Sequence, residues 1–136
     1  MSAPYLVLRV RLVECVHPFF GWVTRDEAMR HKPQAKYLHE RAHVDRAWHV
    51  GRVRYFMERI DSGWKLDPIE VESRVFWRHM SSMPVWCGPK ITDGQHRFAA
   101  AAICGLQTIP ATFDGVITTI NWLTGQRKRR PPELRL

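Results

Sequence analysis

The chain has 136 residues, 45% of them hydrophobic, which is enough for one hydrophobic core, so we expect a single domain over residues 1–125 and a flexible basic tail over 126–136. Its 21 Lys and Arg against 13 Asp and Glu give a formal charge of +8, which favours a polyanionic partner, although many small proteins are simply basic. No apolar run is long enough to span a bilayer, and residues 1–4 do not begin a signal peptide. The three widely spaced cysteines argue against a disulfide framework or a zinc site and favour the reducing cytoplasm.

The first third of the chain predicts a strand, a loop and a short helix. Apolar residues alternate with arginines along 6–12, which is typical of a half-buried strand. Residues 17–22 combine a proline, a glycine and three aromatic residues and predict an aromatic loop. Thr24 and Glu27 have the spacing of a capping box, which predicts a helix that runs to about His31.

A longer helix is predicted from an N-cap at Asp45 to a left-handed C-terminal cap at Gly63, because apolar residues recur every three or four positions between them. One stripe of this helix carries three polar residues, Arg52, Tyr55 and Arg59. The stripe is interpreted either as a surface that faces a common ligand or as a solvated basic face. His49, on the same helix, is either a general base or, as we expect more strongly, a surface histidine.

The second half predicts short strands and one helix of small residues. Strands are expected at 69–72, 85–87 and 90–92, with Gly88-Pro89 turning the chain between the last two. The alanine-rich helix that ends before Gly105 is small enough to lie close to a sheet. A strand is expected at 108–113, where Pro110 suggests a position near a sheet edge, and 116–123 is ambiguous between strand and helix.

The segment from Ile91 to Arg97, with the sequence ITDGQHR, is predicted to be a strand-to-helix turn that binds phosphate. A strand that turns through Asp-Gly and opens a helix leaves backbone N–H groups unpaired at the positive end of the helix dipole. Gly94 allows the unusual backbone angles, and His96 and Arg97 add hydrogen-bond donors and charge. Asp93 is expected to cap the helix or to orient His96 or Arg97. A plain tight turn followed by a surface His-Arg pair is the alternative.

Three segments, 66–71, 91–101 and 105–111, resemble in order and spacing the ParB N-terminal/sulfiredoxin superfamily, often labelled ParB-like nucleases. The resemblance covers about residues 45–114. It implies an α+β fold with a small mixed sheet flanked by helices, in which the Gly-x-His-Arg turn holds the phosphates of ATP, ADP or CTP. By the same resemblance the preceding helix contributes basic and hydroxyl groups. The implied phosphate-binding residues are Gly94, Gln95, His96, Arg97, Arg52, Tyr55 and Arg59.

Two departures from the family narrow the expected activity. Gln95 stands where sulfiredoxins have their catalytic cysteine, which argues against repair of a sulfinic acid. Only about 20 residues follow Phe113, too few for the helix-turn-helix and dimerisation domains of partitioning ParB proteins. The resemblance therefore points to compact members of the superfamily, which include small nucleases, nucleotide hydrolases and kinases of a free amino acid.

For phosphoryl chemistry the expected catalytic residues are Asp93, His96, Arg97 and Glu70, with Mg²⁺ bridging the phosphates of bound ATP or CTP. Glu70 and Glu72 can also be interpreted as surface residues of an ordinary strand. No metal site formed by protein side chains is predicted. A second hypothesis is a non-catalytic plasmid or phage effector that binds a nucleotide, DNA or a host protein through its aromatic loop and its basic tail of Arg127, Lys128, Arg129 and Arg130. A third is a DNA-binding protein held by charge alone.

Overall fold

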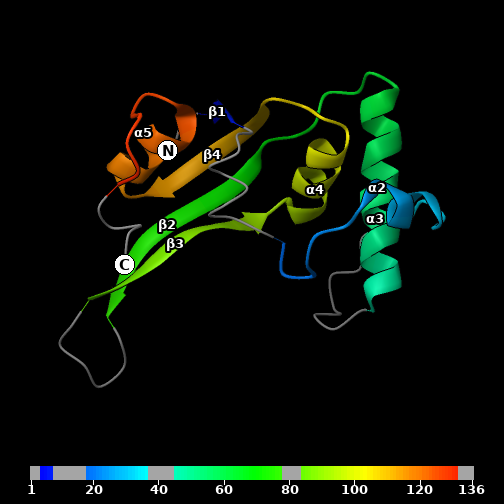
Figure 1. Cartoon of the computed structure of the whole chain (residues 1–136), viewed down its shortest axis with the longest axis horizontal. Helices are drawn as coiled ribbons and strands as arrows, with labels where there is room; N and C mark the ends of the chain where they lie inside the picture. Colours follow the sequence, from blue (N-terminus) through cyan, green and yellow to red (C-terminus); the bar gives the residue numbers. More distant parts are fainter. Residues whose placement is uncertain (1–3, 8–17, 37–44, 78–83, 132–136) are drawn as a thin grey trace.

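The chain forms a mixed α+β fold, described in a computed structural model over residues 4–7, 18–36, 45–77 and 84–131. The strands in these ranges are β1 (Pro4–Val7), β2 (Ile69–Trp77), β3 (Pro84–Asp93) and β4 (Ile109–Gly115). They form one sheet in the order β1-β4-β2-β3. The helices are α2 (Arg25–Met29), α3 (Arg46–Asp61), α4 (Gln95–Ile103) and α5 (Ile117–Thr124). Figure 1 shows the sheet at one end of the molecule, α3 at the other and α4 between them.

The strands β2 and β3 form a long antiparallel pair, and both are longer than the sequence predicts. The expected break at Gly88-Pro89 is wrong, because β3 continues from Pro84 to Asp93. Glu72 pairs with Lys90 but Arg74 pairs with Cys87, so β3 carries one extra residue in this interval. A β-bulge of this kind accommodates a glycine and a proline that cannot keep regular ladder hydrogen bonds, which explains why the strand does not end there.

The strand β4 lies inside the sheet, between β1 and β2, so the edge position suggested by Pro110 is wrong. It runs antiparallel to β1 and parallel to β2. The parallel pairing with β2 begins only at Ala111, opposite Ile69, so Pro110 has a neighbouring strand on the β1 side alone. A proline without an N–H group is therefore tolerated at this position.

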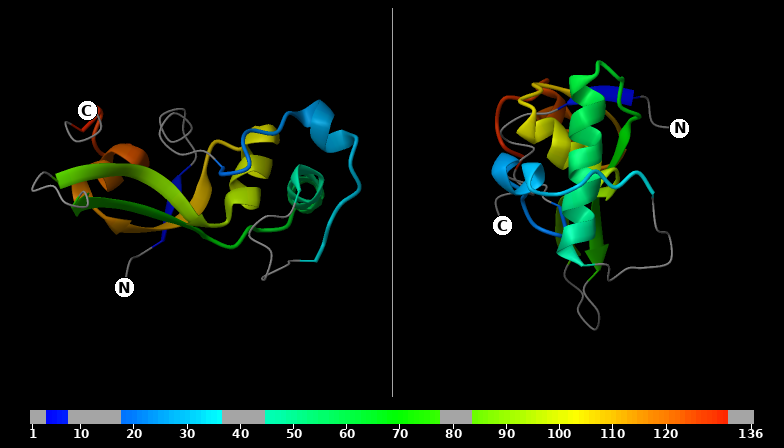
Figure 2. Two further views of the ribbon diagram at one scale, coloured as in Figure 1. Left: turned by 90° about the horizontal axis from the view of Figure 1, so that it is seen from below. Right: turned by 90° about the vertical axis from the view of Figure 1, so that its right-hand side faces the viewer.

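The helix α4 packs on both sides because its residues are small. Phe98 and Ala101 join a cluster with buried residues of the sheet and α5. Ala99 and Ala100 join a second cluster with Val53 and other residues of α2 and α3. Figure 2 gives two further views of α4 between the sheet and α3. The alanines thus let α4 approach two layers at once, which fixes the position of its N-terminus.

Both predicted helix starts are confirmed, with differences in detail. Asp45 caps α3, since its side chain accepts a hydrogen bond from the Trp48 amide, and Gly63 adopts a φ of 83° just beyond the end. The Thr24 hydroxyl accepts from the Glu27 amide at 3.1 Å, but α2 ends at Met29. The ambiguous segment 116–123 is largely helix α5, whose buried face includes Ile120 and Leu123. Most of the strand predicted at 6–12 lies outside the described residues.

No helix in the described ranges is long and apolar enough to cross a membrane.

Candidate functional site

A cavity of about 290 Å³ opens where the N-terminus of α4 meets α3 and the loop before α2. Its walls combine backbone and side chains from the end of β3, the first turn of α4, α3 and the loop. The lining residues are Phe19, Arg52, Phe56, Thr92, Asp93, Gly94, Gln95, His96 and Arg97. The structure therefore gathers six residues that the sequence predicted for one site, namely Asp93, Gly94, Gln95, His96, Arg97 and Arg52.

The turn into α4 has the geometry expected of an anion-binding helix start. Gly94 is the N-cap, with a left-handed φ of 94°, and it provides no side-chain hydrogen bond to the first turn. The carbonyl of Gly94 accepts the first helical bond from the Phe98 amide at 2.9 Å. The N–H groups of the intervening residues point along the helix axis, at the positive end of its dipole. Asp93 does not cap the helix; its carboxylate accepts a hydrogen bond from Arg97 at 3.3 Å, so it orients that arginine.

Two arginines supply the positive charge of the cavity. Arg97 contacts Asp93 and the Pro68 carbonyl through Nη2, while its buried Nε has no hydrogen-bond partner among the described residues. Arg52 is only 7% exposed, and its Nη1 donates to the carbonyls of Gln34 and Ala35 at 3.0 and 2.8 Å. Arg52 therefore ties the segment after α2 to α3 as well as lining the cavity.

His96 and His49 form a hydrogen-bonded pair beside the cavity. The Nε2 atom of His96 lies 2.9 Å from Nδ1 of His49. His49 is 5% exposed, so the expectation of a surface histidine is wrong: the first turn of α3 packs against α4 and buries it. Burial, together with the smaller effects of the nearby His49, Arg52 and Arg97, lowers the pKa of His96 to about 3. His96 is therefore a neutral imidazole at physiological pH and adds hydrogen bonds, not charge.

The loop of residues 18–22, called here the aromatic loop, covers this histidine pair. The Phe20 ring stacks on both His49 and His96, with ring centres 5.0 Å apart in each case. Gln95 holds the loop, because its side-chain oxygen accepts a hydrogen bond from the Phe19 amide at 2.6 Å. Gln95, expected from the sequence to contact phosphate, thus holds the loop through its side chain, a contact that its place in the turn alone does not indicate.

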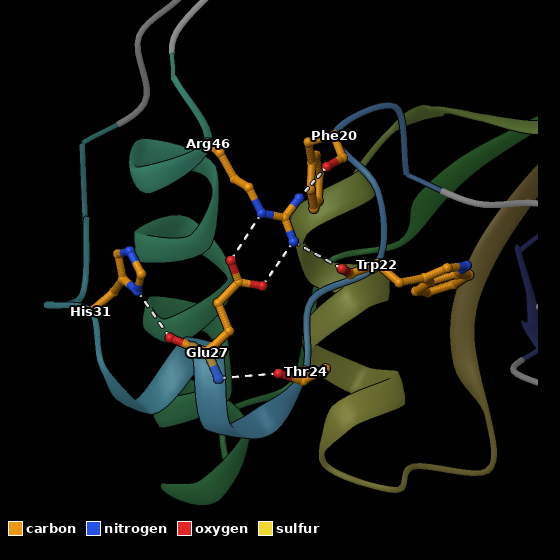
Figure 3. A network of polar contacts seen from close by, with 6 residues as sticks. All are labelled: Phe20, Trp22, Thr24, Glu27, His31 and Arg46. Carbon is orange, nitrogen blue, oxygen red and sulfur yellow. Dashed lines mark hydrogen bonds and ion pairs between the residues drawn. The ribbon is translucent and has the colours of Figure 1, made fainter.

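Arg46 also holds the aromatic loop, and no pattern in the sequence predicts this role. Its guanidinium donates to the carbonyls of Phe20 and Trp22 at 2.6 and 3.0 Å, and it forms two bonds with the Glu27 carboxylate at 2.9 and 2.7 Å (Figure 3). The hydrogen bond from Arg46 holds the pKa of Glu27 below its usual value. Glu27, predicted to complete a capping box, instead connects α2 to α3 and, through Arg46, to the loop.

Replacing Glu27 with glutamine is expected to loosen the aromatic loop with little effect on global stability. The pair is partly exposed, so its loss should lower the free energy of unfolding by about 1 kcal/mol or less. Because the folded pKa of Glu27 is depressed, its contribution is fully present above the unfolded value near 4.5 and is lost as the pH falls through the lower folded value. In amide NMR spectra, the loop signals of Glu27→Gln at neutral pH should resemble those of the wild type in acid.

The matched control for that variant is Glu58→Gln, which removes an exposed ion pair between Glu58 and Arg54 on α3 without touching the loop. Its loop signals should remain those of the wild type at neutral pH. Identical loop spectra for wild type and Glu27→Gln would show that Arg46 holds the loop without the carboxylate.

Three predicted site residues lie outside this cavity. Tyr55 and Arg59 line an adjacent cavity of about 190 Å³ that shares Phe56 and Arg97 with the first. Arg59 lies over the ring of Trp64 there, 4.4 Å from its centre, and donates to the Tyr55 hydroxyl. Glu70 instead lines another hollow of about 330 Å³, together with Glu72 and Asp114 on the sheet, which shares Thr92 with the first cavity. Glu70 is therefore next to the turn through its backbone, as the strand partner of Asp93, but it does not line the first cavity.

Neither Cys104 nor the basic tail, in the part that the structure describes, lines the cavity. The tail lies against α5 as far as it is described: the Arg127 amide donates to the Asn121 carbonyl, and Arg130 lies 6.0 Å from the Trp122 ring centre. Its flexibility and its contact with DNA stay predictions. Burial raises the pKa of the Cys104 thiol, which keeps it protonated. Among the described residues no group of three or more His, Cys, Asp or Glu is placed to hold a metal ion.

Comparisons of this chain with protein-family models, with curated proteins and with solved structures found no match.

Proposed function

We propose that this protein binds the phosphates of a nucleotide, ATP or CTP, at the start of α4, and that it hydrolyses or transfers phosphate as a compact ParB/sulfiredoxin-like protein. The observation that carries the proposal is the cavity at residues 93–97, where an uncapped helix N-terminus and two arginines face the same space. Backbone N–H groups and guanidinium groups are the donors that phosphate oxygens prefer.

The net charge of the cavity favours a phosphate ester that is bound together with a cation. Arg52 and Arg97 are opposed by Asp93, the one acidic residue among the described residues that line the cavity, and His96 is neutral. The net charge of the lining is thus about one positive, less than a triphosphate needs. A Mg²⁺ ion bridging the phosphates, with Asp93 nearby, would supply the rest, since Mg²⁺ is commonly held by one or two carboxylates and the substrate.

The adjacent cavity supports a nucleotide over free phosphate. It begins at Arg97 and Phe56, continues along α3, and ends at Trp64, which is 62% exposed. An exposed tryptophan and an arginine are suitable stacking partners for a base. Tyr55 and Arg59, expected from the sequence to contact phosphates, are proposed to contact the ribose or the base instead.

Replacing Arg97 with alanine is expected to weaken nucleotide binding by about 10- to 100-fold, because a charge-assisted hydrogen bond contributes roughly 1.5–3 kcal/mol. Thermal unfolding in the presence of ATP, CTP, ADP or orthophosphate, with and without Mg²⁺, gives the affinities, since a ligand that binds the folded state raises its melting temperature. Phosphate release from the same mixtures, and cleavage of plasmid DNA, measure turnover.

The control is Arg30→Ala, the same loss of charge at an exposed position outside the cavity, which should bind like the wild type. If no nucleotide raises the melting temperature of the wild type, the proposal is wrong. Nucleotide binding without turnover would favour the non-catalytic effector. DNA binding that falls steeply with salt, without nucleotide affinity, would favour a protein held to DNA by charge.

A further inference from the structure

The contact between His49 and His96 is an edge-to-edge hydrogen bond between two imidazoles. Their nitrogens are 2.9 Å apart, closer than stacked ring faces approach, while the ring centres are 5.2 Å apart and the planes differ by 14°. The two rings therefore lie almost in one plane with their nitrogens facing each other. One of the two nitrogens donates the shared proton and the other accepts it.

Aromatic side chains enclose this pair. Phe20 stacks on both imidazoles, with its plane within 9° of each. The Trp48 ring meets both edge-on, at 5.1 and 5.5 Å, and Phe19 meets His49 edge-on at 5.0 Å. An enclosure of this kind keeps the rings aligned and lowers the dielectric around the shared proton, which strengthens the hydrogen bond.

His96 connects the enclosed pair to the cavity, because it lines the cavity while its Nε2 faces His49. Its other ring nitrogen, Nδ1, has no partner among the described residues. The two neutral tautomers of His96 differ in which nitrogen carries the proton. When Nε2 of His96 carries the shared proton and donates it in a hydrogen bond to Nδ1 of His49, Nδ1 of His96 is unprotonated and can act as a base.

We propose that His49 and His96 form a proton relay that activates water for hydrolysis of the bound nucleotide. This inference rests on the proposed nucleotide site and specifies its reaction as hydrolysis. His96 is the catalytic residue that contacts the reacting water, and His49 is a positioning residue that acts through it.

The protons and bonds of the step balance without a co-reactant. The water oxygen forms a bond to the terminal phosphorus as the bond from phosphorus to the bridging oxygen breaks, and the leaving nucleoside diphosphate takes that electron pair. The water proton moves to Nδ1 of His96, and the Nε2 proton of His96 moves to Nδ1 of His49. His96 is neutral before and after the step, and His49 carries the positive charge.

This final distribution of charge is consistent with the surroundings of the two rings. Arg52 on α3 and Arg97 on α4 lie close enough to His96 to lower its pKa, and Asp93 at the end of β3 offsets Arg97. Adjacent positive charge opposes an imidazolium at His96. Transfer of the proton from His96 to His49 moves the positive charge to a residue that does not line the cavity.

The test replaces His49 with asparagine, whose amide can keep a hydrogen bond to His96 but cannot take up a proton. With whichever of ATP and CTP stabilises the wild type more, in the presence of Mg²⁺, kcat should fall about 100-fold or more, the range of general base catalysis. The dissociation constant from thermal shifts should stay within about threefold, because His49 does not line the cavity.

Two further readouts separate a relay from a merely structural role. In the wild type kcat should decrease in acid as the pair takes up a proton, and in His49→Asn this dependence should disappear. The double variant His49→Asn/His96→Asn should be no slower than His96→Asn alone, because residues that act as a unit are not additive. His31→Asn makes the same change at a histidine that contacts the Glu27 carbonyl away from the cavity, and should leave kcat unchanged.

The outcomes distinguish this inference from the proposed function. Turnover by His49→Asn at the wild-type rate overturns the relay and leaves the nucleotide site intact. Nucleotide binding without any hydrolysis by the wild type does the same. If no nucleotide binds to the wild type, the proposed function fails and the relay fails with it.

Discussion

Replacing Gly94 with alanine is expected to abolish nucleotide binding and to lower the free energy of unfolding by about 3 kcal/mol. Gly94 has a φ of 94°, which side-chain-bearing residues rarely adopt. A Cβ atom there would lie 2.5 Å from Cγ2 of Ile69 and 2.6 Å from Nη2 of Arg97. The arginine can move, but Ile69 is fully buried in the sheet core. The start of α4 must therefore shift, which displaces the amides that are proposed to bind phosphate.

Gly63→Ala is the matched control for this variant. Gly63 has a similar φ of 83°, but a Cβ atom there meets nothing within 4 Å. Gly63→Ala should lower the free energy of unfolding by about 1–2 kcal/mol, the cost of the left-handed backbone conformation alone. It should bind nucleotide like the wild type. Urea unfolding gives the stabilities, and thermal shifts with ATP and CTP give the affinities. Equal losses of stability for the two variants, with affinity retained in Gly94→Ala, would contradict the role assigned to this turn.

The sequence predicts the parts of the site that lie close together along the chain. Residues 93–97 are consecutive, so the glycine, the helix that follows and the charged residues could be interpreted together as an anion site. The assignment of α3 succeeded for a similar reason, since its apolar period and both of its end signals are local. Arg52 was expected to face a ligand both from its place on the polar stripe of the helix and from the resemblance, and the packing of α3 against α4 places it beside the turn.

Contacts between distant positions could not be predicted from one sequence. The Phe19 amide and the Gln95 side chain are 76 positions apart, and Arg46 is 26 positions from the Phe20 carbonyl that it contacts. His49 was expected on the surface because nothing in its helical period shows that α4 packs against that end of α3. A buried histidine pair becomes visible only when the packing of the two helices is known.

The strand predictions failed at positions where the pairing with neighbouring strands decides whether a glycine or a proline is tolerated. Gly88 and Pro89 interrupt most strands, but here the extra residue of a bulge accommodates them. Pro110 suggested an edge because a proline cannot donate to a neighbouring strand, yet β2 begins one residue later. The register between paired strands decides whether Gly88-Pro89 and Pro110 are tolerated. This register depends on both strands of a pair and cannot be derived from the residues of one.

Replacing Gly115 with alanine is expected to lower the free energy of unfolding by about 4 kcal/mol or more, a large part of the roughly 5–15 kcal/mol of an ordinary domain. Gly115 ends β4 with a φ of 125° and is paired with Ser73 of β2. A Cβ atom would lie 1.6 Å from the Ser73 carbonyl oxygen. Neither strand can yield locally, because that oxygen also accepts a hydrogen bond from the Val116 amide at the start of α5.

The loss should be structural and not specific to the cavity, because Gly115 does not line it. The fraction of Gly115→Ala that remains folded at low temperature should therefore bind nucleotide with wild-type affinity, in contrast to Gly94→Ala. Gly105→Ala is the control, since Gly105 also has a positive φ, 74°, but open space around its Cβ position. Hydrogen exchange should show the amides of β4 and α5 opening in Gly115→Ala before those of α3. A stability equal to that of Gly105→Ala would contradict this prediction, because it would mean that β2 and β4 do not approach at Ser73 as closely as their pairing requires.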